Sequence, residues 1–356
     1  MSTTLTERQA RKQVEREAKL EAVQQRLTIA VEQLVTGDDW RRALEFSAKF
    51  RSRSFRNSML IAVQHAEAYE QGRVPTPFPS YVAGYKQWLT LGRQVRKGEA
   101  GYQILSPKTA RFATSTPSDP SSWRRLATNE KAQPGETVRT RMTGVRLAYV
   151  WDISLTEGDD LPTTPAPQIL KGEAPEGLWD GLADLITEEG YELRLVSNAA
   201  AIGGANGLTD FQTREVSVRV DMDDSAQIKS LCHELGHVLL TDPDSPDAPF
   251  HRGIAEVEAE SVALVVGAAH GMDTSAYSVP YVATWANTVP ETNPVDVVQA
   301  TAERVRRAAL GILDRLDTHQ TATGAPPGLE PRVPTSKAPQ AERTVQHVKP
   351  SEAIGL

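Results

Sequence analysis

The sequence predicts an α+β protein of two domains with additional segments at both ends. Its 356 residues are enough for two modest hydrophobic cores. Stretches with helical periodicity are separated by short alternating stretches that are typical of strands. The proline-rich residues 159–176 favour a linker between the two halves. We therefore expect an N-terminal helix over 1–37, domains over 38–158 and 177–317, and a disordered tail over 318–356.

The first domain is expected to begin with helices and to continue with short strands. Residues 5–35 predict a long polar helix, whose sparse apolar positions favour a partner surface or a short coiled coil. Further helices are expected at 39–49, 55–69 and 85–91, and strands at 101–106 and 145–152. Residues 108–141 are polar and predict a long mobile loop or insertion between the two strands.

The second domain is expected to place two strands before its strongest helices. A helix over 176–190 is followed by strands at 191–196 and 214–220. Helical periodicity then covers 224–240, 252–269 and 295–316. The alternating strand at 214–220 lies just before the helix at 224–240, so we expect it to be an edge strand that holds an extended substrate.

Composition excludes several classes of protein. Hydrophobic residues make up 39% of the chain, and no apolar run approaches the roughly 20 residues that span a bilayer. The N-terminal residues lack the apolar core of a secretory signal. Cys232 is the single cysteine, which excludes a disulfide framework and a zinc site of several cysteines. These features predict a cytoplasmic protein with no membrane partner.

Charge is distributed unevenly along the chain. Residues 38–155 contain 19 Lys and Arg against 10 Asp and Glu, a balance of +9, whereas residues 156–317 contain 10 against 28, a balance of −18. A basic half joined to an acidic half indicates that the basic half binds a polyanion, and nucleic acid is the first candidate. A solvated basic surface without a ligand is the alternative.

The helix expected at 224–240 contains the motif HExxH, with His233, Glu234 and His237. Residues four apart share a helix face, so the two imidazoles converge on one ion and Glu234 projects beside it. The apolar residues of this helix, Cys232 among them, occupy an arc on the opposite side. The pattern predicts one zinc ion, or another divalent first-row metal, per chain.

A third ligand is expected from the following helix, which offers Glu256, Glu258 and Glu260. Glu258 is surrounded by apolar residues on the helical wheel, whereas the other two glutamates point away. A carboxylate on an apolar face is costly unless it is paired or binds a metal, so we expect Glu258 to be the ligand. His251 competes for this role from a loop.

The expected chemistry is hydrolysis of a peptide bond. Zinc would lower the pKa of its water, and Glu234 would act as general base and pass the proton to the leaving nitrogen. Tyr277, Tyr281 and His251 are weak candidates for stabilising the oxyanion, and a structural role is the more ordinary interpretation of each.

Two resemblances to known families support this interpretation. The run HELGHVLL at 233–240, followed by residues 256–263, resembles the gluzincin-like peptidases of the ImmA/IrrE type. That resemblance maps the family's Glu-Ala ligand pair onto Glu258 and Ala259. The basic half resembles the single-stranded-DNA-binding domain of ArdC-type antirestriction proteins, and the matching residues lie at 55–64, 84–88, 91–99 and 150–158. Together the resemblances imply a DNA-binding first domain and a zincin-like metallopeptidase domain with an HExxH helix.

The resemblance to ArdC-type proteins indicates cations and aromatic residues that could bind DNA. The cations expected to meet phosphates are Arg51, Arg53, Arg56, Arg93, Arg96 and Lys97. Tyr81, Tyr85 and Trp88 lie between these cations and could stack on bases, although Trp88 alone is more often a core residue. Asn57 is either a DNA contact or an internal hydrogen-bond partner. No base-reading motif is present, so we expect sequence-independent binding of single-stranded DNA.

These observations favour a single-stranded-DNA-binding zinc metalloendopeptidase with an antirestriction-like or DNA-linked role. One alternative is a non-catalytic, DNA-binding restriction inhibitor whose zinc site is structural. A general base such as Glu234 argues against that alternative, because a structural site does not need one. A second alternative is a DNA-sensing regulator that cleaves a partner repressor.

Overall fold

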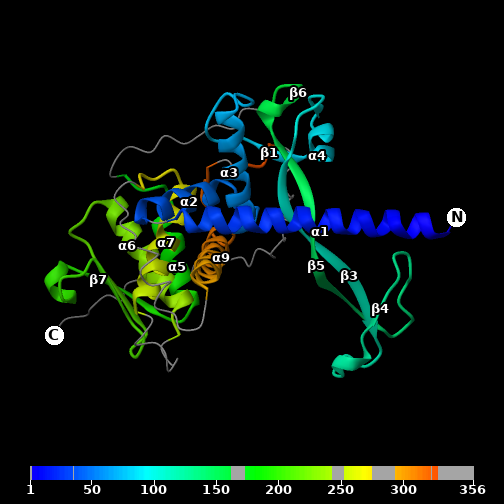
Figure 1. The fold of residues 1–356 in the computed structure, drawn as a ribbon. Coiled ribbons are helices and arrows are strands. Elements are labelled where there is room, and N and C mark those ends of the chain that lie inside the picture. The colour runs from blue at the N-terminus through cyan, green and yellow to red at the C-terminus, as the bar shows by residue number, and fades with distance from the viewer. Residues whose placement is uncertain are drawn as a thin grey trace, which may run out of the picture.

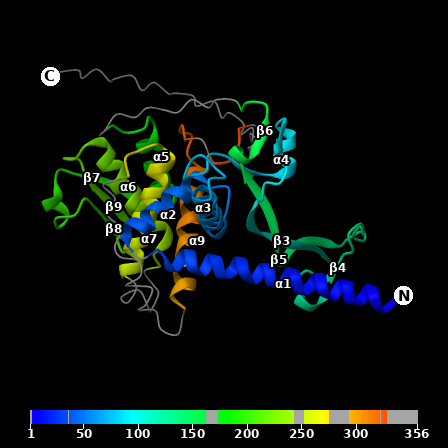
Figure 2. The ribbon, with the colours of Figure 1, turned by 45° about the horizontal axis from the view of Figure 1, so that its top comes forward.

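The computed structural model describes residues 2–34, 36–161, 173–242, 252–274, 293–321 and 323–327. It is a mixture of helices and sheets, which confirms the predicted α+β class. Figure 1 shows a helical body, a smaller β-rich head around β1, α4 and β6, and a long ribbon formed by β3 and β5. Helix α1 (Ser2–Glu32) crosses the ribbon, and its N-terminal end lies far from the body (Figures 1 and 2).

The N-terminal half places its helices before and between the strands. The helices are α2 (Gly37–Lys49), α3 (Phe55–Glu70) and α4 (Tyr85–Thr90). The strands are β1 (Val82–Gly84), β2 (Arg93–Val95), β3 (Tyr102–Thr114), β4 (Arg124–Arg125), β5 (Thr137–Asp152) and β6 (Thr156–Gly158). One sheet has the order β1-β5-β3-β4, and β2 pairs separately with β6.

The C-terminal half contains four helices and a small sheet within the described residues. The helices are α5 (Leu178–Glu188), α6 (Asp224–Leu240), α7 (Arg252–Ala269) and α9 (Pro294–Leu313). The strands are β7 (Glu192–Val196), β8 (Gly207–Asp210) and β9 (Glu215–Arg219), in the order β7-β9-β8. Strand β9 is parallel to β7 and antiparallel to β8. The expectation that 214–220 is an edge strand is therefore wrong, because β9 is central and β8 lies at the edge.

Polar side chains fix the starts of the main helices. Thr36 caps α2 and forms a capping box with Asp39, in which each side chain bonds the other's backbone N–H. Asp223 accepts a hydrogen bond from the Ala226 N–H at the start of α6. Asn293 caps α9, which opens with Pro294 at a position where the missing N–H costs no helical bond.

One hydrophobic core joins the two halves of the chain. Helices α1, α2 and α3 contribute buried side chains to the same cluster as α5, α6, α7 and α9. At its centre Trp40 of α2 is fully buried, and its Nε1 donates to Ser261 Oγ of α7 over 2.9 Å. Helices of the 38–158 segment thus complete the core around α7, so the segments expected as two domains share one hydrophobic core.

A second, smaller core lies between α3 and the sheet of the head. Ile61 of α3 packs with Val82, Ile104 and Val150, which come from β1, β3 and β5. On the same helix, Leu60 belongs to the larger core. Helix α3 is therefore shared between the body and the head, which fixes one relative to the other.

The expectation of a long loop at 108–141 is wrong at both ends, because 108–114 and 137–141 are strands of an antiparallel ribbon, whereas 115–136 form the connection at its tip and include β4. Strands β3 and β5 pair from Tyr102 opposite Val150 to Thr114 opposite Thr137, with a register shift between Lys108 and Thr109. Most side chains of this segment are exposed on both faces. A ribbon that is solvated on both faces lacks the apolar alternation by which a strand is recognised in a sequence.

The first residues of the segment expected as a disordered tail are hydrogen-bonded to the rest of the fold. The Thr321 N–H donates to Ala269 O of α7, and the Gly324 N–H donates to Lys49 O of α2. Gly324 O in turn accepts from the Val82 N–H of β1. Residues 318–321 and 323–327 thus connect the body to the head, and the rest of the expected tail lies outside the described residues. No helix in the described ranges is long and apolar enough to cross a bilayer.

Candidate functional site

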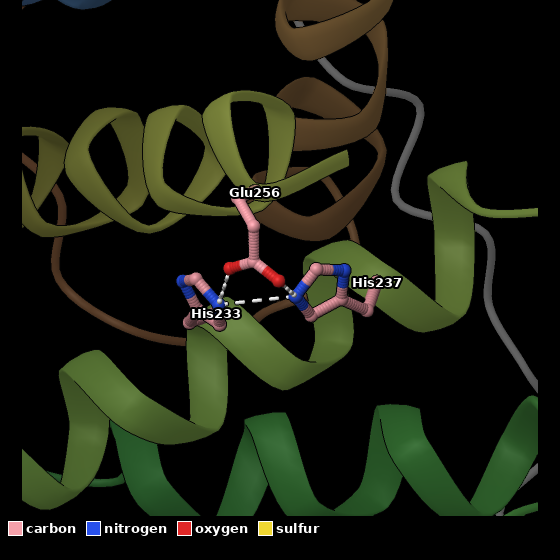
Figure 3. A group of neighbouring side chains, drawn as sticks. All are labelled: His233, His237 and Glu256. Carbon is pink, nitrogen blue, oxygen red and sulfur yellow. Dashed lines mark hydrogen bonds and ion pairs between the residues drawn. The ribbon is translucent and has the colours of Figure 1, made fainter. Parts of the chain in front are cut away.

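The candidate metal centre lies between α6 and α7, where the two helices approach closely. A Cβ atom on Gly236 would lie 2.8 Å from Ala259 Cα, so these two small residues allow the close approach. Histidines of α6 and glutamates of α7 face each other on this side of the pair (Figure 3). The HExxH motif is therefore held on a buried helix whose neighbour supplies carboxylates.

Three side chains, His233, His237 and Glu256, converge as a possible ligand set. The Nε2 atoms of the two histidines are 3.1 Å apart. Glu256 places Oε2 3.3 Å from His233 Nε2 and Oε1 3.5 Å from His237 Nε2. Ligands about 2.0–2.1 Å from a tetrahedral ion stand roughly 3.3 Å apart, so these separations fit a divalent metal. Two imidazoles and one carboxylate are also a donor set used by catalytic zinc.

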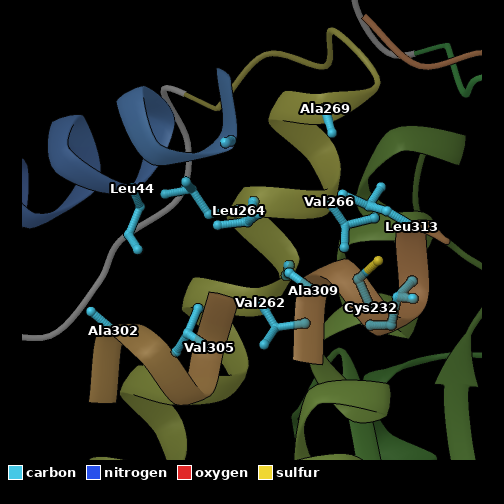
Figure 4. Packing of buried hydrophobic residues seen from close by; sticks show 14 of the residues in the cluster. Leu44, Cys232, Val262, Leu264, Val266, Ala269, Ala302, Val305, Ala309 and Leu313 are labelled. Carbon is cyan, nitrogen blue, oxygen red and sulfur yellow. The ribbon is translucent and has the colours of Figure 1, made fainter. Parts of the chain in front are cut away.

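The expectation that Glu258 completes this site is wrong. Glu258 is buried and lies on another face of α7, with Oε2 3.3 Å from a guanidinium nitrogen of Arg304 on α9. Burial raises its pKa to about 7, against the opposing effect of Arg304. The reason for the error is that α7 is buried on several sides (Figure 4): Leu264 points toward α2 and Val262 toward α9. Apolar neighbours therefore did not identify the face directed at α6.

Glu260 occupies a position behind the ligand set. Its carboxylate lies 3.2 Å from His233 Nδ1 and 2.8 Å from Lys229 Nζ. A carboxylate on the far nitrogen of a ligating histidine fixes the ring and its tautomer, and leaves Nε2 directed at the metal. We did not predict this role from the sequence. The spacing of Lys229, His233 and His237 on α6 against Glu256 and Glu260 on α7 was the available signal.

Hydrogen bonds among the clustered histidines and glutamates shift the pKa values of His233 and Glu256. Burial favours a neutral His233, but hydrogen bonds with Glu256 and Glu260 outweigh it and raise the pKa of His233 to about 9. Hydrogen bonds with His233 and His237 hold the pKa of Glu256 well below its usual range. An ionised carboxylate is thus already favoured at the site, and a metal would displace a proton from His233.

Glu234, the expected general base, is held between α6 and the edge strand β8. Only 5% of the residue is exposed, and its Oε2 accepts a 2.7 Å hydrogen bond from Thr209 Oγ1. A Cβ atom on Gly207 would lie 2.6 Å from Glu234 Oε1, so that position leaves no room for a side chain. Burial raises the pKa of Glu234, and the charges of His233 and His237 act in the opposite direction. The carboxylate is therefore near the histidines but bonded to the neighbouring sheet.

The residues considered for stabilising the oxyanion lie outside the part of the chain that the structure describes. These residues are Tyr277, Tyr281 and His251. His251 therefore has no assigned relation to the ligand set.

Several residues expected to bind DNA instead hold the fold together. Trp88 is fully buried and donates from Nε1 to Trp151 O, so it is a core residue and cannot stack on bases. Asn57 donates to Leu105 O and accepts from the Leu105 N–H, which makes it an internal partner of β3. Arg93 bonds Thr156 and the backbone of Gly158, at the β2–β6 pair. These three expectations are corrected.

The remaining cations divide between the interior and the surface. Arg53 donates to Val82 O, and burial lowers its pKa. Arg51 donates to Thr321 O of the C-terminal segment. Arg56 and Lys97 are exposed, and Arg96 pairs with Glu99 at 3.1 Å while keeping 42% of its side chain exposed. Only Arg56, Arg96 and Lys97 of the expected set therefore present substantial charge to solvent.

A surface platform of aromatic residues contains Tyr85, which was expected to stack on bases, together with Tyr149 and Trp151, which were missed in the sequence. It consists of Tyr85, Tyr149 and Trp151, whose neighbouring ring centroids are 6.2 and 6.5 Å apart. Tyr85 is 48% exposed and Tyr149 is 42% exposed. Trp151 Nε1 donates to Glu99 O, which places the turn that carries Arg96 and Lys97 next to the platform. The alternation of Tyr149 and Trp151 on β5 was the signal for a shared face.

Comparison with known proteins bears on the N-terminal half. Residues 17–151 match the family described as the N-terminal domain of anti-restriction factor ArdC. This segment is ArdC-like. It comprises the C-terminal half of α1, helices α2, α3 and α4, the ribbon and the platform, so the resemblance seen in the sequence is supported for this half.

More distant similarities extend over more of the chain. An uncharacterized protein of Bacillus anthracis is 27% identical over 265 residues, which are 70% of this chain and 43% of that protein. The chain thus spans less than half the length of this relative. Two crystal structures of antirestriction ArdC protein from the R388 plasmid are also similar. The metal-free one has 16% identity, a TM-score of 0.43, and covers 73% of this chain and 84% of its own. The Mn(II)-bound one has 17% identity, a TM-score of 0.41, and coverages of 73% and 83%.

Proposed function

We propose that this chain is a metal-dependent peptidase that also binds single-stranded DNA, with a DNA-linked antirestriction role. The observation that carries the peptidase proposal is the convergence of His233, His237 and Glu256 beside the buried carboxylate of Glu234. The family similarity of residues 17–151 supports the DNA-linked role.

His233, His237 and Glu256 would hold the metal, with Glu260 fixing the ring of His233 from behind. A divalent ion bound there supplies Lewis acidity, which makes a coordinated water more acidic and polarises a substrate carbonyl. Zinc is the first candidate because of the donor set. Glu234 would accept the proton of the attacking water and deliver it to the leaving amine nitrogen. A raised pKa suits both proton transfers, because the carboxylate must first accept the proton and the carboxylic acid must then donate it.

The edge strand β8 would hold the substrate as an extended chain. Because β8 pairs only with β9 among the described strands, its outer side offers backbone N–H and C=O groups for β-strand addition. Thr209 of this strand bonds Glu234 directly, so a chain paired with β8 would run next to the general base. Leu208, which is 48% exposed on the same strand, would contact a substrate side chain.

Elemental analysis tests the metal centre and its third ligand. We expect about one metal per chain in the wild type, and loss of metal in His233→Ala and Glu256→Ala, because each removes a ligand. Glu258→Gln is the matched control, since Glu258 is also a buried glutamate of α7 but faces Arg304. Equal metal content in all four proteins would refute the site. Loss of metal in Glu258→Gln alone would instead favour Glu258, the third ligand expected from the sequence.

The platform of Tyr85, Tyr149 and Trp151 would bind single-stranded DNA by stacking, with Arg96 and Lys97 meeting phosphates. Tyr85→Ala is expected to weaken binding of a single-stranded oligonucleotide by about 1–3 kcal/mol, measured by fluorescence anisotropy. Tyr69→Ala is the matched control, because Tyr69 is similarly exposed on α3 and has no place in the platform. Equal affinities for the two variants and the wild type would remove the platform from the proposal.

The alternative function is a non-catalytic DNA-binding inhibitor with a structural metal. Glu234 weighs against it, because a buried glutamate with a raised pKa contributes nothing to a purely structural site. A regulator that cleaves a partner repressor uses the same two sites and differs only in its substrate.

A further inference from the structure

The ribbon of β3 and β5 extends beyond the head as an arm, which we define as residues 106–146. Beyond the register shift, Thr109–Thr114 pair with residues 137–142, a paired length of about 20 Å. Strand β4 adds a short third strand at the tip by pairing with Phe112 and Ala113. Both views of the fold show the arm projecting away from the helical body (Figures 1 and 2). Within the described part of the chain, no residue of the arm belongs to the larger core or to the candidate metal centre.

The arm carries more positive charge than its own carboxylates neutralise. It contains eight Lys and Arg residues against three Asp and Glu residues, a balance of +5. Arg124 binds both Glu130 and Glu136, and Asp119 caps a short 3-10 helix. Seven cations then have no carboxylate within ion-pair distance among the described residues: Lys108, Arg111, Arg125, Lys131, Arg139, Arg141 and Arg146.

The aromatic residues of the arm are covered by arginines. Arg139 and Arg141 lie over the ring of Trp123, with guanidinium carbons 5.1 and 4.8 Å from its centre. Arg141 also lies 5.7 Å from the centre of the Phe112 ring. These faces are therefore not open for stacking on unpaired bases, unlike Tyr85 and Tyr149 of the platform. The stacking instead holds two guanidinium groups in place at the surface, with their N–H donors still available.

We propose that the arm binds double-stranded DNA by lying in its major groove. A two-stranded antiparallel ribbon fits that groove, which is about 12 Å wide, and β3 and β5 form such a ribbon between the head and the short strand β4 at the tip. Cations on both faces of the ribbon then meet the phosphates of the two groove walls: the register places Arg139 and Arg141 on one face and Arg111 on the other. The arm is thus a duplex-binding surface separate from the single-strand platform, and shares with it only the assignment of DNA as partner.

Anisotropy titrations of the full chain with a blunt DNA duplex, over a range of salt concentrations, test this inference. The variant Arg139→Gln/Arg141→Gln removes two phosphate contacts. The slope of log affinity against log salt should therefore fall by about 1.8, since each contact contributes about 0.9. Arg125→Gln/Lys131→Gln should also lower the slope and leaves the cover of Trp123 intact. The charge-matched control is Arg194→Gln/Arg307→Gln on the body, which should keep the wild-type slope.

Single-stranded DNA of the same length separates this inference from the proposed function. Both arm variants should bind it as the wild type does, whereas Tyr85→Ala should lose single-strand binding and keep duplex binding. Failure of the wild type to bind duplex would overturn the arm proposal even if single strands are bound. An unchanged duplex slope in both arm variants would do the same, as would equal losses for duplex and single strand.

Discussion

Replacing Glu234 with Gln is expected to lower peptide-bond hydrolysis by about 10²- to 10⁴-fold, the usual contribution of a positioned general base. The amide cannot accept the proton of the attacking water, but it fills the same space against Gly207 and Thr209. None of the three candidate ligands is altered, so metal content should be unchanged. Cleavage of labelled casein and elemental analysis of the same preparation measure the two quantities together.

The control for this experiment is Glu258→Gln, which makes the same carboxylate-to-amide change at a buried glutamate that faces Arg304. It should cleave casein at close to the wild-type rate. Cleavage by Glu234→Gln at the wild-type rate would contradict the assignment of Glu234 as general base and would not bear on the proposed metal centre. An inactive wild type with a full metal content would instead favour the non-catalytic inhibitor.

Trp40→Ala is expected to lower the free energy of unfolding by about 3–5 kcal/mol, because it leaves a cavity where α2 meets α7. Trp40 is fully buried, and its indole N–H bonds Ser261, which would be left without that donor. Urea unfolding followed by circular dichroism measures the change. Because the core is continuous across α2, α7 and α9, we expect the lost free energy of unfolding to appear in the main cooperative unfolding transition.

Tyr69→Ala provides the surface control for the stability experiment. Tyr69 is 44% exposed, so its removal should change the free energy of unfolding by about 0.5 kcal/mol or less. Two separate transitions, of which Trp40→Ala moves only one, would contradict a shared core. That result would favour two domains with separate cores.

The helices of the body could be predicted closely because their signals are local. The expected helix at 224–240 coincides with α6, and that at 252–269 coincides with α7. Asp223 marks the start of α6 through a cap that spans only three residues. The geometry of the HExxH motif is equally local, since four residues of helix bring His233 and His237 together.

The strands of the arm and the burial of Trp88 could not be predicted from patterns of neighbouring residues in the sequence. The strands of the arm are solvated on both faces, so their pairing left no alternation to detect. Trp88 lies between basic residues in the sequence, which suggested DNA binding, but the fold places it in the interior, where its Nε1 donates to Trp151 O. Neighbours in space, and not neighbours in sequence, decided both outcomes.

The sequence by itself determined the α+β class, the helix that carries HExxH and two of the three candidate ligands, because these depend on periodicity and on spacing within one element. Only the tertiary structure decided the third ligand. Glu256 and Glu258 differ by two residues, and the packing of α7 between α6 and α9 directs one to the histidines and the other to Arg304. A helix buried on several sides presents each face to a different partner, and its sequence does not say which partner each face meets.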